Sequence, residues 1–222
     1  MPKIQLALDT LSAETALELA RLAAPYVDIL EAGTPLIKSA GIGIVSRLKV
    51  AHPDKLVLAD LKSSDVGAYE AGMAFAAGAD IVTTQGITTL ATIVEVQREA
   101  DKWKRRAEVD MTGVVRPVDR SRVVKESGVS LVLYHRSIDQ ELTEGALWDE
   151  EACQTVREMC SLGLDVAVAG GLKLELLPKL AGIPIYNLVI GRGITGRGIT
   201  GQADPAQAAK AIFDRCRALW PA

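Results

Sequence analysis

Short apolar runs alternate with longer amphipathic segments along the whole chain. Inside each run most residues are hydrophobic, and polar and apolar positions do not alternate cleanly. This pattern is typical of parallel strands that are covered on both faces. The eight predicted strands cover residues 3–9, 27–33, 56–62, 80–86, 106–113, 130–137, 164–171 and 186–193.

The segments between these runs predict helices. In "SAETALELARLAAPY", Leu17 and Ala20 belong to a set of residues at helical spacing, and Ser12 is the expected N-cap. The last segment opens with Asp204 as a cap and Pro205 at the first helical position. Both ends of the chain therefore carry clear helix signals.

A strand followed by a helix, eight times in 222 residues, predicts a single-domain (β/α)8 TIM barrel over residues 1–222. An open doubly wound sheet is the alternative, but a Gly-x-Gly-x-x-Gly motif does not follow the first strand, which disfavours a dinucleotide-binding fold. The sequence contains no linker and no low-complexity segment.

Composition and charge exclude several classes of partner. Hydrophobic residues make up 49% of the chain and charged residues 24%, and the net charge is −3. Only "KWKRR" (102–106) is locally basic, so no nucleic acid is expected as a partner. The N-terminus lacks a signal-peptide layout, and no apolar run approaches the roughly 20 residues of a membrane span.

The three cysteines, Cys153, Cys160 and Cys216, do not form a disulfide framework. If the segment is helical, Cys153 and Cys160 lie two turns apart, about 10 Å, which is too far for a disulfide. We therefore expect a reduced, cytoplasmic protein.

Ionisable residues gather at the C-terminal ends of the predicted strands. In a (β/α)8 barrel these ends form the rim that carries the chemistry. Each residue alone also fits a loop or a helix cap, but together they indicate an active site. The candidates are Asp9, Glu31, Asp60, Lys62, Asp110 and His135.

One stretch, "VLADLKSSDVGAYEAG" (57–72), places two carboxylates and an ammonium at one strand end. Asp60, Lys62 and Asp65 fall within six residues. The carboxylates would keep the Lys62 ammonium charged and oriented beside a reacting centre. The alternative interpretation is a surface ion-pair cluster.

The ends of the last two strands predict a phosphate site. Loops after these strands form the usual phosphate site of such barrels, and glycine lets backbone N–H groups approach the ligand closely. "GRGITGRGIT" (191–200) is a tandem repeat, whose second copy either lengthens a loop or adds Arg197 as a contact. The candidate ligands are Ala169, Gly170, Gly171, Gly191 and Arg192.

The Asp-x-Lys-x-x-Asp pattern resembles the signature of the orotidine 5′-monophosphate decarboxylase suprafamily. Within it, the chain is similar over essentially its whole length to the 3-keto-L-gulonate 6-phosphate decarboxylases and the 3-hexulose 6-phosphate synthases. The matching stretches are "QLALD", "VDILEAGTP", "LADLKSSDVG", "VDMTG", "YHRS", "AVAGGLKLELLP" and "IGRGIT".

This resemblance implies a homodimeric barrel that binds Mg²⁺ and a phosphorylated keto sugar. Glu31 and Asp60 match the metal ligands, and Lys62 matches a lysine that hydrogen-bonds a developing enediolate. Mg²⁺ prefers carboxylate, water and substrate oxygens, which agrees with this assignment. The metal and the lysine would stabilise negative charge while a C–C bond breaks.

The resemblance also assigns three further roles. Asp65 matches a residue that reaches into the neighbouring subunit's site. Asp9 matches a contact to a substrate hydroxyl group, and His135 matches the proton donor of the decarboxylases. Glu31 distinguishes the chain from the nucleotide decarboxylases, which need no metal, so orotidine 5′-monophosphate is not the expected substrate.

The sequence combines features of both related enzymes. "YHRS", the downstream "ALW" and Arg192 resemble the decarboxylases, whereas Asp110, Ala169 and "TP" at 34–35 resemble the synthases. Ile138 stands where the decarboxylases usually carry arginine. We expect decarboxylation of 3-keto-L-gulonate 6-phosphate to L-xylulose 5-phosphate, with addition of formaldehyde to D-ribulose 5-phosphate as the alternative.

Two other classes remain open. The chain could be a phosphosugar-binding barrel that has lost catalysis, although its complete set of metal, lysine and aspartate residues argues against decay. A ketose-phosphate epimerase would usually need several histidines for its metal, and the chain has only His52, before a proline in a loop, and His135.

Overall fold

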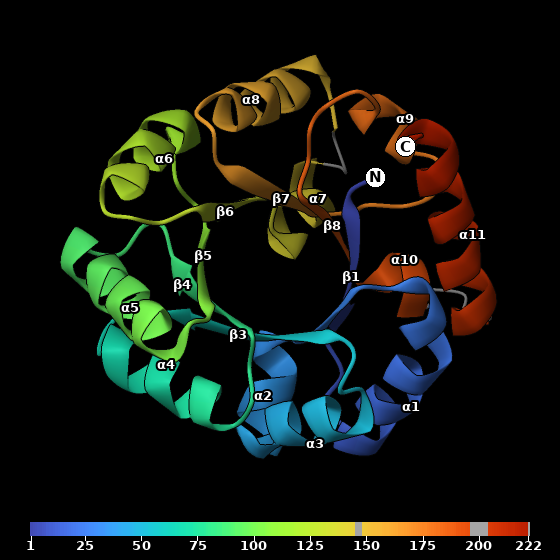
Figure 1. The fold of residues 1–222 in the computed structure, drawn as a ribbon. Coiled ribbons are helices and arrows are strands. Elements are labelled where there is room, and N and C mark those ends of the chain that lie inside the picture. Colours follow the sequence, from blue (N-terminus) through green and yellow to red (C-terminus); the bar gives the residue numbers. More distant parts are fainter. Residues whose placement is uncertain (145–147, 196–203, 222) are drawn as a thin grey trace.

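The computed structural model describes residues 1–144, 148–195 and 204–221, and its strands form a closed parallel barrel (Figure 1). Each strand pairs with its neighbours in sequence, and β8 pairs with β1 to close the ring. The predicted (β/α)8 barrel is confirmed. The strands are β1 (Lys3–Leu8), β2 (Ile29–Ala32), β3 (Leu56–Ser63), β4 (Ile81–Gln85), β5 (Arg106–Asp110), β6 (Leu131–His135), β7 (Asp165–Ala169) and β8 (Asn187–Ile190).

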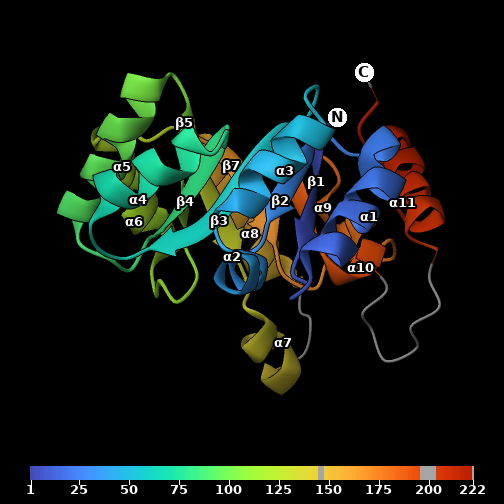
Figure 2. The ribbon, with the colours of Figure 1, turned by 90° about the horizontal axis from the view of Figure 1, so that it is seen from below.

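Helices surround the ring of strands, and α7 stands away from it in the side view (Figure 2). Because α7 directly follows β6, it lies at the C-terminal end of the barrel. The helices are α1 (Ala13–Ala23), the 3-10 helix η1 (Ala24–Tyr26), α2 (Thr34–Ala40), α3 (Gly43–Ala51), α4 (Gly67–Ala76), α5 (Leu90–Trp103), α6 (Pro117–Glu126), α7 (Ile138–Glu144), α8 (Glu150–Ser161), α9 (Leu177–Leu180), α10 (Arg192–Thr195) and α11 (Pro205–Leu219).

The predicted helix caps are present at both ends of the chain. Ser12 Oγ accepts a hydrogen bond from the Thr15 backbone N–H at 3.2 Å, and α1 begins at the next residue. Asp204 accepts from the Ala206 N–H at 3.0 Å, and Pro205 opens α11. These bonds satisfy backbone donors that the first turn of a helix leaves free.

Two layers of apolar side chains hold the barrel together. The larger layer lies between the strands and the helices. Because side chains alternate along a strand, the other set points into the barrel. This inner set includes Leu58, Ile81 and Leu131, together with the small residues Ala7 and Ala169 near the C-terminal ends of their strands.

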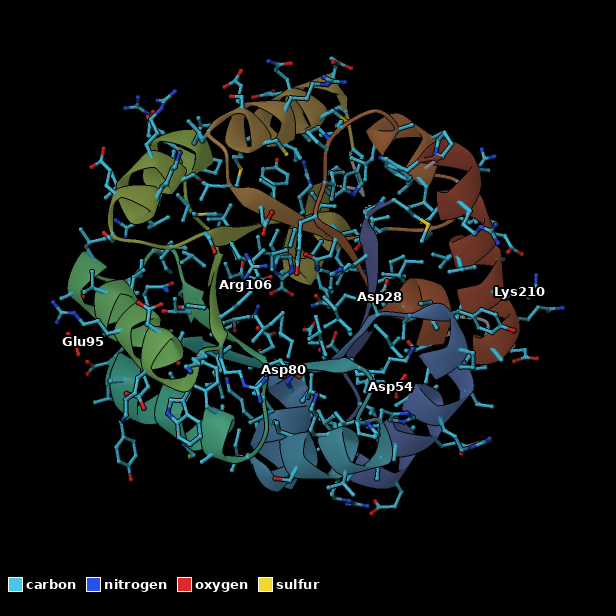
Figure 3. All side chains as sticks on the ribbon, in the orientation of Figure 1. Asp28, Asp54, Asp80, Glu95, Arg106 and Lys210 are labelled. Carbon is cyan, nitrogen blue, oxygen red and sulfur yellow. The ribbon has the colours of Figure 1, made fainter. Side chains whose placement is uncertain are left out.

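The N-terminal end of the barrel carries a group of ion pairs. Asp80 accepts hydrogen bonds from Lys49 Nζ at 2.9 Å, from Arg105 and from the Val57 N–H at 2.8 Å. Arg106 pairs with Asp165 at 2.7 Å. Figure 3 shows Asp80 and Arg106 beside the ring of strands, whereas Glu95 and Lys210 lie on the outer helices.

The described residues also bear on two expectations about the environment of the protein. Among them, no helix is both long and apolar enough to cross a membrane. Cys153, Cys160 and Cys216 are free thiols, which agrees with the predicted absence of a disulfide framework.

Candidate active site

A cavity of about 560 Å³ opens at the C-terminal ends of the strands, and every strand contributes to its lining. The structure therefore brings most of the predicted site residues together. Asp110 is fully buried behind this lining, and Asp65 lies outside it. The predicted residues that line the cavity are Asp9, Glu31, Asp60, Lys62, His135, Ala169, Gly170, Gly171, Gly191 and Arg192.

Lys62 is held at the end of β3 by an irregular backbone and two carboxylates. The register between β3 and β4 shifts between Ala59 and Ser63, and Lys62 has a φ of 49°, which is uncommon for a residue other than glycine. Its Nζ lies 2.5 Å from Asp110 Oδ2 and 3.2 Å from Asp60 Oδ2. The ammonium is thus fixed in place before any substrate arrives.

The pKa of Lys62 is raised, so the side chain stays cationic. Burial alone would lower this pKa, but the charges of Asp60 and Asp110 outweigh it. A permanent positive charge in a partly dry cavity stabilises negative charge that develops next to it.

Asp110 joins Lys62 to His135. Asp110 Oδ2 lies 3.0 Å from His135 Nδ1, and Oδ1 accepts from the Thr112 N–H at 2.9 Å and the Thr112 hydroxyl at 2.6 Å. Burial raises the pKa of Asp110, but its bonds to His135 and the charges of His135 and Lys62 bring it well below its usual range. An ionised Asp110 only accepts, so Nδ1 of His135 carries a proton and Nε2 remains for a substrate.

A second group of carboxylates lies on β2 and β3. Glu31 Oε2 accepts from Gln5 Nε2 at 2.6 Å, and Asp60 accepts from the hydroxyls of Thr34 and Thr83, both at 2.7 Å. Burial, and then the charges of Asp60 and Asp9, raise the pKa of Glu31. Negative charge is therefore concentrated on this side of the cavity, and a bound cation would relieve it.

The donor set fits magnesium. Glu31 and Asp60 both line the cavity, and Mg²⁺ is commonly held by one or two carboxylates together with water and substrate oxygens. Within the described ranges, no group of three or more His, Cys, Asp or Glu residues is arranged to hold a metal ion. Two carboxylates would leave the other positions of a bound Mg²⁺ ion to substrate and water.

The predicted phosphate end combines backbone turns with one arginine. Gly170 has a φ of 111°, and a side chain there would meet the Arg136 carbonyl oxygen at 2.4 Å, so only glycine fits. Trp148 Nε1 donates to the Gly170 carbonyl at 2.8 Å. Arg192 forms an ion pair with Glu141 of α7, and both side chains line the cavity.

Some sequence predictions fall away from this cavity or outside the described residues. Asp65 is exposed, and its Oδ1 accepts from the Val66 N–H at 2.8 Å. Arg197 and the second copy of the tandem repeat lie outside the described residues, as do the first two residues of "ALW". Ile138, at the position where the decarboxylases usually carry arginine, lines the cavity.

Several polar residues of the site were not predicted. Glu108 shares the inward side of β5 with the predicted residue Asp110, so the alternation of side chains was a usable signal. Glu141 could not be found this way, because it lies on helix α7 and not on a strand. The missed polar residues of the lining include Gln5, Thr34, Thr83, Glu108, Thr112 and Glu141.

Comparisons with known proteins cover nearly the whole chain. Residues 2–212 match the family described as "Orotidine 5'-phosphate decarboxylase / HUMPS family". The 3-hexulose-6-phosphate synthase of Mycobacterium gastri is 38% identical over 210 residues, which are 95% of this chain and 97% of that protein. The 3-keto-L-gulonate-6-phosphate decarboxylase UlaD of Escherichia coli (strain K12 / DH10B) is 34% identical over 220 residues, 99% of each chain. A crystal structure of KGPDC from Streptococcus mutans has a TM-score of 0.92 at 30% identity and covers 99% of both chains.

Proposed function

Because this chain belongs to the orotidine 5′-phosphate decarboxylase / HUMPS family, we propose that it is a carbon–carbon lyase acting on a phosphorylated keto sugar through an enediolate. The observation that carries this proposal is the Lys62 ammonium, fixed 2.5 Å from Asp110 at the wall of the cavity. A preorganised charge of this kind stabilises an oxyanion without reorganisation during the reaction.

The reaction that we place first is the addition of formaldehyde to D-ribulose 5-phosphate. The sequence features favoured decarboxylation, but identities of 38% to a synthase and 34% to a decarboxylase do not favour that expectation. The cavity wall supports the synthase, because Ile138 and Ala169 present apolar side chains where the decarboxylases usually carry arginine and threonine. A neutral one-carbon substrate needs no cation at position 138.

Decarboxylation of 3-keto-L-gulonate 6-phosphate is the second candidate, and His135 supports it. Its Nδ1 is bonded to Asp110 at 3.0 Å, while the ring lines the cavity. A proton on Nε2 could then be delivered to the enediolate carbon that remains after CO₂ leaves. In both candidate reactions Lys62 stabilises the enediolate. The enediolate carbon then attacks formaldehyde in the first reaction and takes a proton in the second.

Glu31 and Asp60 would hold the Mg²⁺ ion in either reaction. When bound, the ion would supply positive charge to neighbouring oxygens of the substrate. Lys62 would hydrogen-bond the enediolate oxygen, and Asp9, at the cavity wall, would accept from a substrate hydroxyl. Arg192 and the backbone at Gly170, Gly171 and Gly191 would bind the phosphate.

A homodimer with shared sites is part of the proposal. Asp65 is exposed, and large apolar side chains are exposed on the neighbouring elements: Val66, Tyr69 and Met73 at α4, and Leu90 at α5. Mixing inactive Asp65→Ala and Lys62→Ala subunits should restore up to about a quarter of wild-type activity, because half the dimers gain one intact site. No recovery, with subunit exchange verified, would contradict a shared site.

The reaction is tested by supplying each substrate separately with Mg²⁺. Ribulose 5-phosphate plus formaldehyde should yield a hexulose 6-phosphate, which NMR with ¹³C-formaldehyde detects as a new C–C bond. Release of CO₂ from 3-keto-L-gulonate 6-phosphate, without turnover of formaldehyde, would favour the second candidate. Binding of ribulose 5-phosphate with no turnover of either substrate would identify an inactive binding barrel and contradict both.

A further inference from the structure

Glu108 is a buried carboxyl group that the proposed mechanism leaves unused. It lies on β5 two residues before Asp110, so it faces the same inner side of the strand, about 7 Å deeper in the barrel. Its side chain lines the cavity and is 1% exposed. Among the described residues, neither of its oxygens has a hydrogen-bond partner.

This arrangement is costly if Glu108 only fills space. A buried polar group without a partner destabilises a fold, and an apolar side chain of similar volume would pack beside Leu58 and Leu131 at no such cost. Two buried aspartates of the barrel, Asp80 and Asp110, have their hydrogen bonds made by the chain itself. The missing partner of Glu108 therefore belongs to whatever enters the cavity.

The charges around Glu108 define what that partner can be. Burial and then the negative charges of Asp110 and Asp60 raise its pKa to about 8, while Lys62 and Arg106 act in the opposite direction. At neutral pH the group is a neutral acid with an O–H to donate. The same carboxylates repel anions, so the partner is an uncharged acceptor, and the depth of the site within the barrel requires it to be small.

We propose that the floor of the cavity is the binding site of formaldehyde, and that Glu108 donates a hydrogen bond to its carbonyl oxygen. This inference rests on the proposed addition of formaldehyde and deepens it by assigning the second substrate its own residue. Formaldehyde is neutral and small, and it has one acceptor oxygen. The hydrogen bond also draws electron density from the carbon that the enediolate attacks.

Two variants of Glu108 separate this role from packing. Glu108→Met keeps the length of the side chain but removes the donor, whereas Glu108→Gln keeps a neutral donor. We expect Glu108→Met to raise the KM for formaldehyde about tenfold, which is the loss of one hydrogen bond. The KM for ribulose 5-phosphate should stay within about twofold, and Glu108→Gln should change either KM less than about threefold.

Ser121 provides the matched control. Its hydroxyl is also fully buried without a partner among the described residues, but it lies on α6, away from the cavity lining. Ser121→Ala should leave both KM values unchanged. Thermal unfolding verifies that each variant folds, and Glu108→Leu replaces the methionine variant if that one does not.

Two results with Glu108→Met would overturn the inference. An unchanged KM for formaldehyde would show that Glu108 donates no hydrogen bond to it. An equal rise of both KM values would show that Glu108 only maintains the structure of the site. Turnover of formaldehyde by the wild-type protein is measured first, and its absence would be known before any variant is made. That result contradicts the proposed reaction and removes the formaldehyde site with it.

Discussion

Asp80 and Asp110 are both buried aspartates that bind two basic side chains, yet they lie at opposite ends of the barrel and differ in use. Asp80, at the N-terminal end, binds Lys49 and Arg105. Asp110, at the C-terminal end, binds Lys62 and His135. A buried ion pair at the end of a barrel strand is therefore not by itself evidence of an active site.

The difference lies in how the neighbouring charges are balanced. At the N-terminal end, Lys49 also donates to the Lys55 carbonyl at 2.8 Å, so the chain itself satisfies the group. At the C-terminal end, Lys62 and His135 line a cavity that also receives Asp9, Glu31 and Asp60. Here the carboxylates outnumber the basic groups and face an open cavity, so they remain available to the proposed metal ion and substrate.

Removing the lysine at each end should give the largest difference between the two ends. Lys62→Ala should lower kcat about a thousandfold, because it removes a preorganised charge at the reacting centre. Lys49→Ala should leave kcat within about threefold but lower the free energy of unfolding by about 1–3 kcal/mol, since Asp80 loses one buried partner. Steady-state kinetics and urea unfolding measure both.

Either of two results would contradict the contrast between the ends. A loss of less than about tenfold in Lys62→Ala would make this lysine structural. A comparable loss of kcat in Lys49→Ala would mean that activity depends on general stability and not on the charge at the cavity.

Removal of the metal tests the charge excess at the C-terminal end. Chelation with EDTA should lower kcat about a hundredfold or more, and added Mg²⁺ should restore it. Glu31→Gln should weaken Mg²⁺ binding in calorimetry, whereas Glu18→Gln, at an exposed pair with Arg21, should not. Full activity in EDTA would refute the metal role of Glu31 and Asp60.

The sequence predicted the barrel because its signals are local. Continuous apolar runs and caps such as Ser12 and Asp204 depend on neighbouring residues, and eight strand–helix units are the number that a (β/α)8 barrel needs. It also predicted the rim residues, because parallel strands bring their C-terminal ends together. Lys62 and Asp110, 48 residues apart, meet for this reason.

The remaining features depend on space and on contacts between distant segments. The inward side of Glu108 follows from its spacing to Asp110, but the open floor beside it depends on the packing of all eight strands. Glu141 meets Arg192 because α7 follows β6 and α10 follows β8, so both helices begin at the C-terminal end of the barrel. Asp65 is exposed in the single chain, and its proposed role across a dimer depends on a contact between two copies of the chain.

Glu141 gives the smallest and most selective test of the C-terminal end. Its carboxylate pairs with Arg192, which we assign to the substrate phosphate, so the two anions compete for one guanidinium. Glu141→Gln should lower the KM for the phosphorylated sugar about fivefold and leave kcat nearly unchanged, because the phosphate is bound equally in the ground state and in the transition state. Calorimetry with inorganic phosphate should show the same gain in affinity.

Asp139→Asn is the control, because it also removes one negative charge from α7, but at an exposed residue. General electrostatic repulsion of the substrate would fall equally in both variants. If both variants lower KM alike, the effect is long-range and the pair with Arg192 is incidental. If Glu141→Gln raises KM, Glu141 orients the guanidinium for phosphate and does not compete with it. Combining Glu141→Gln with Arg192→Ala tests whether the lower KM depends on the guanidinium. In the Arg192→Ala background, Glu141→Gln should no longer lower KM, because the carboxylate and the phosphate no longer compete for one partner.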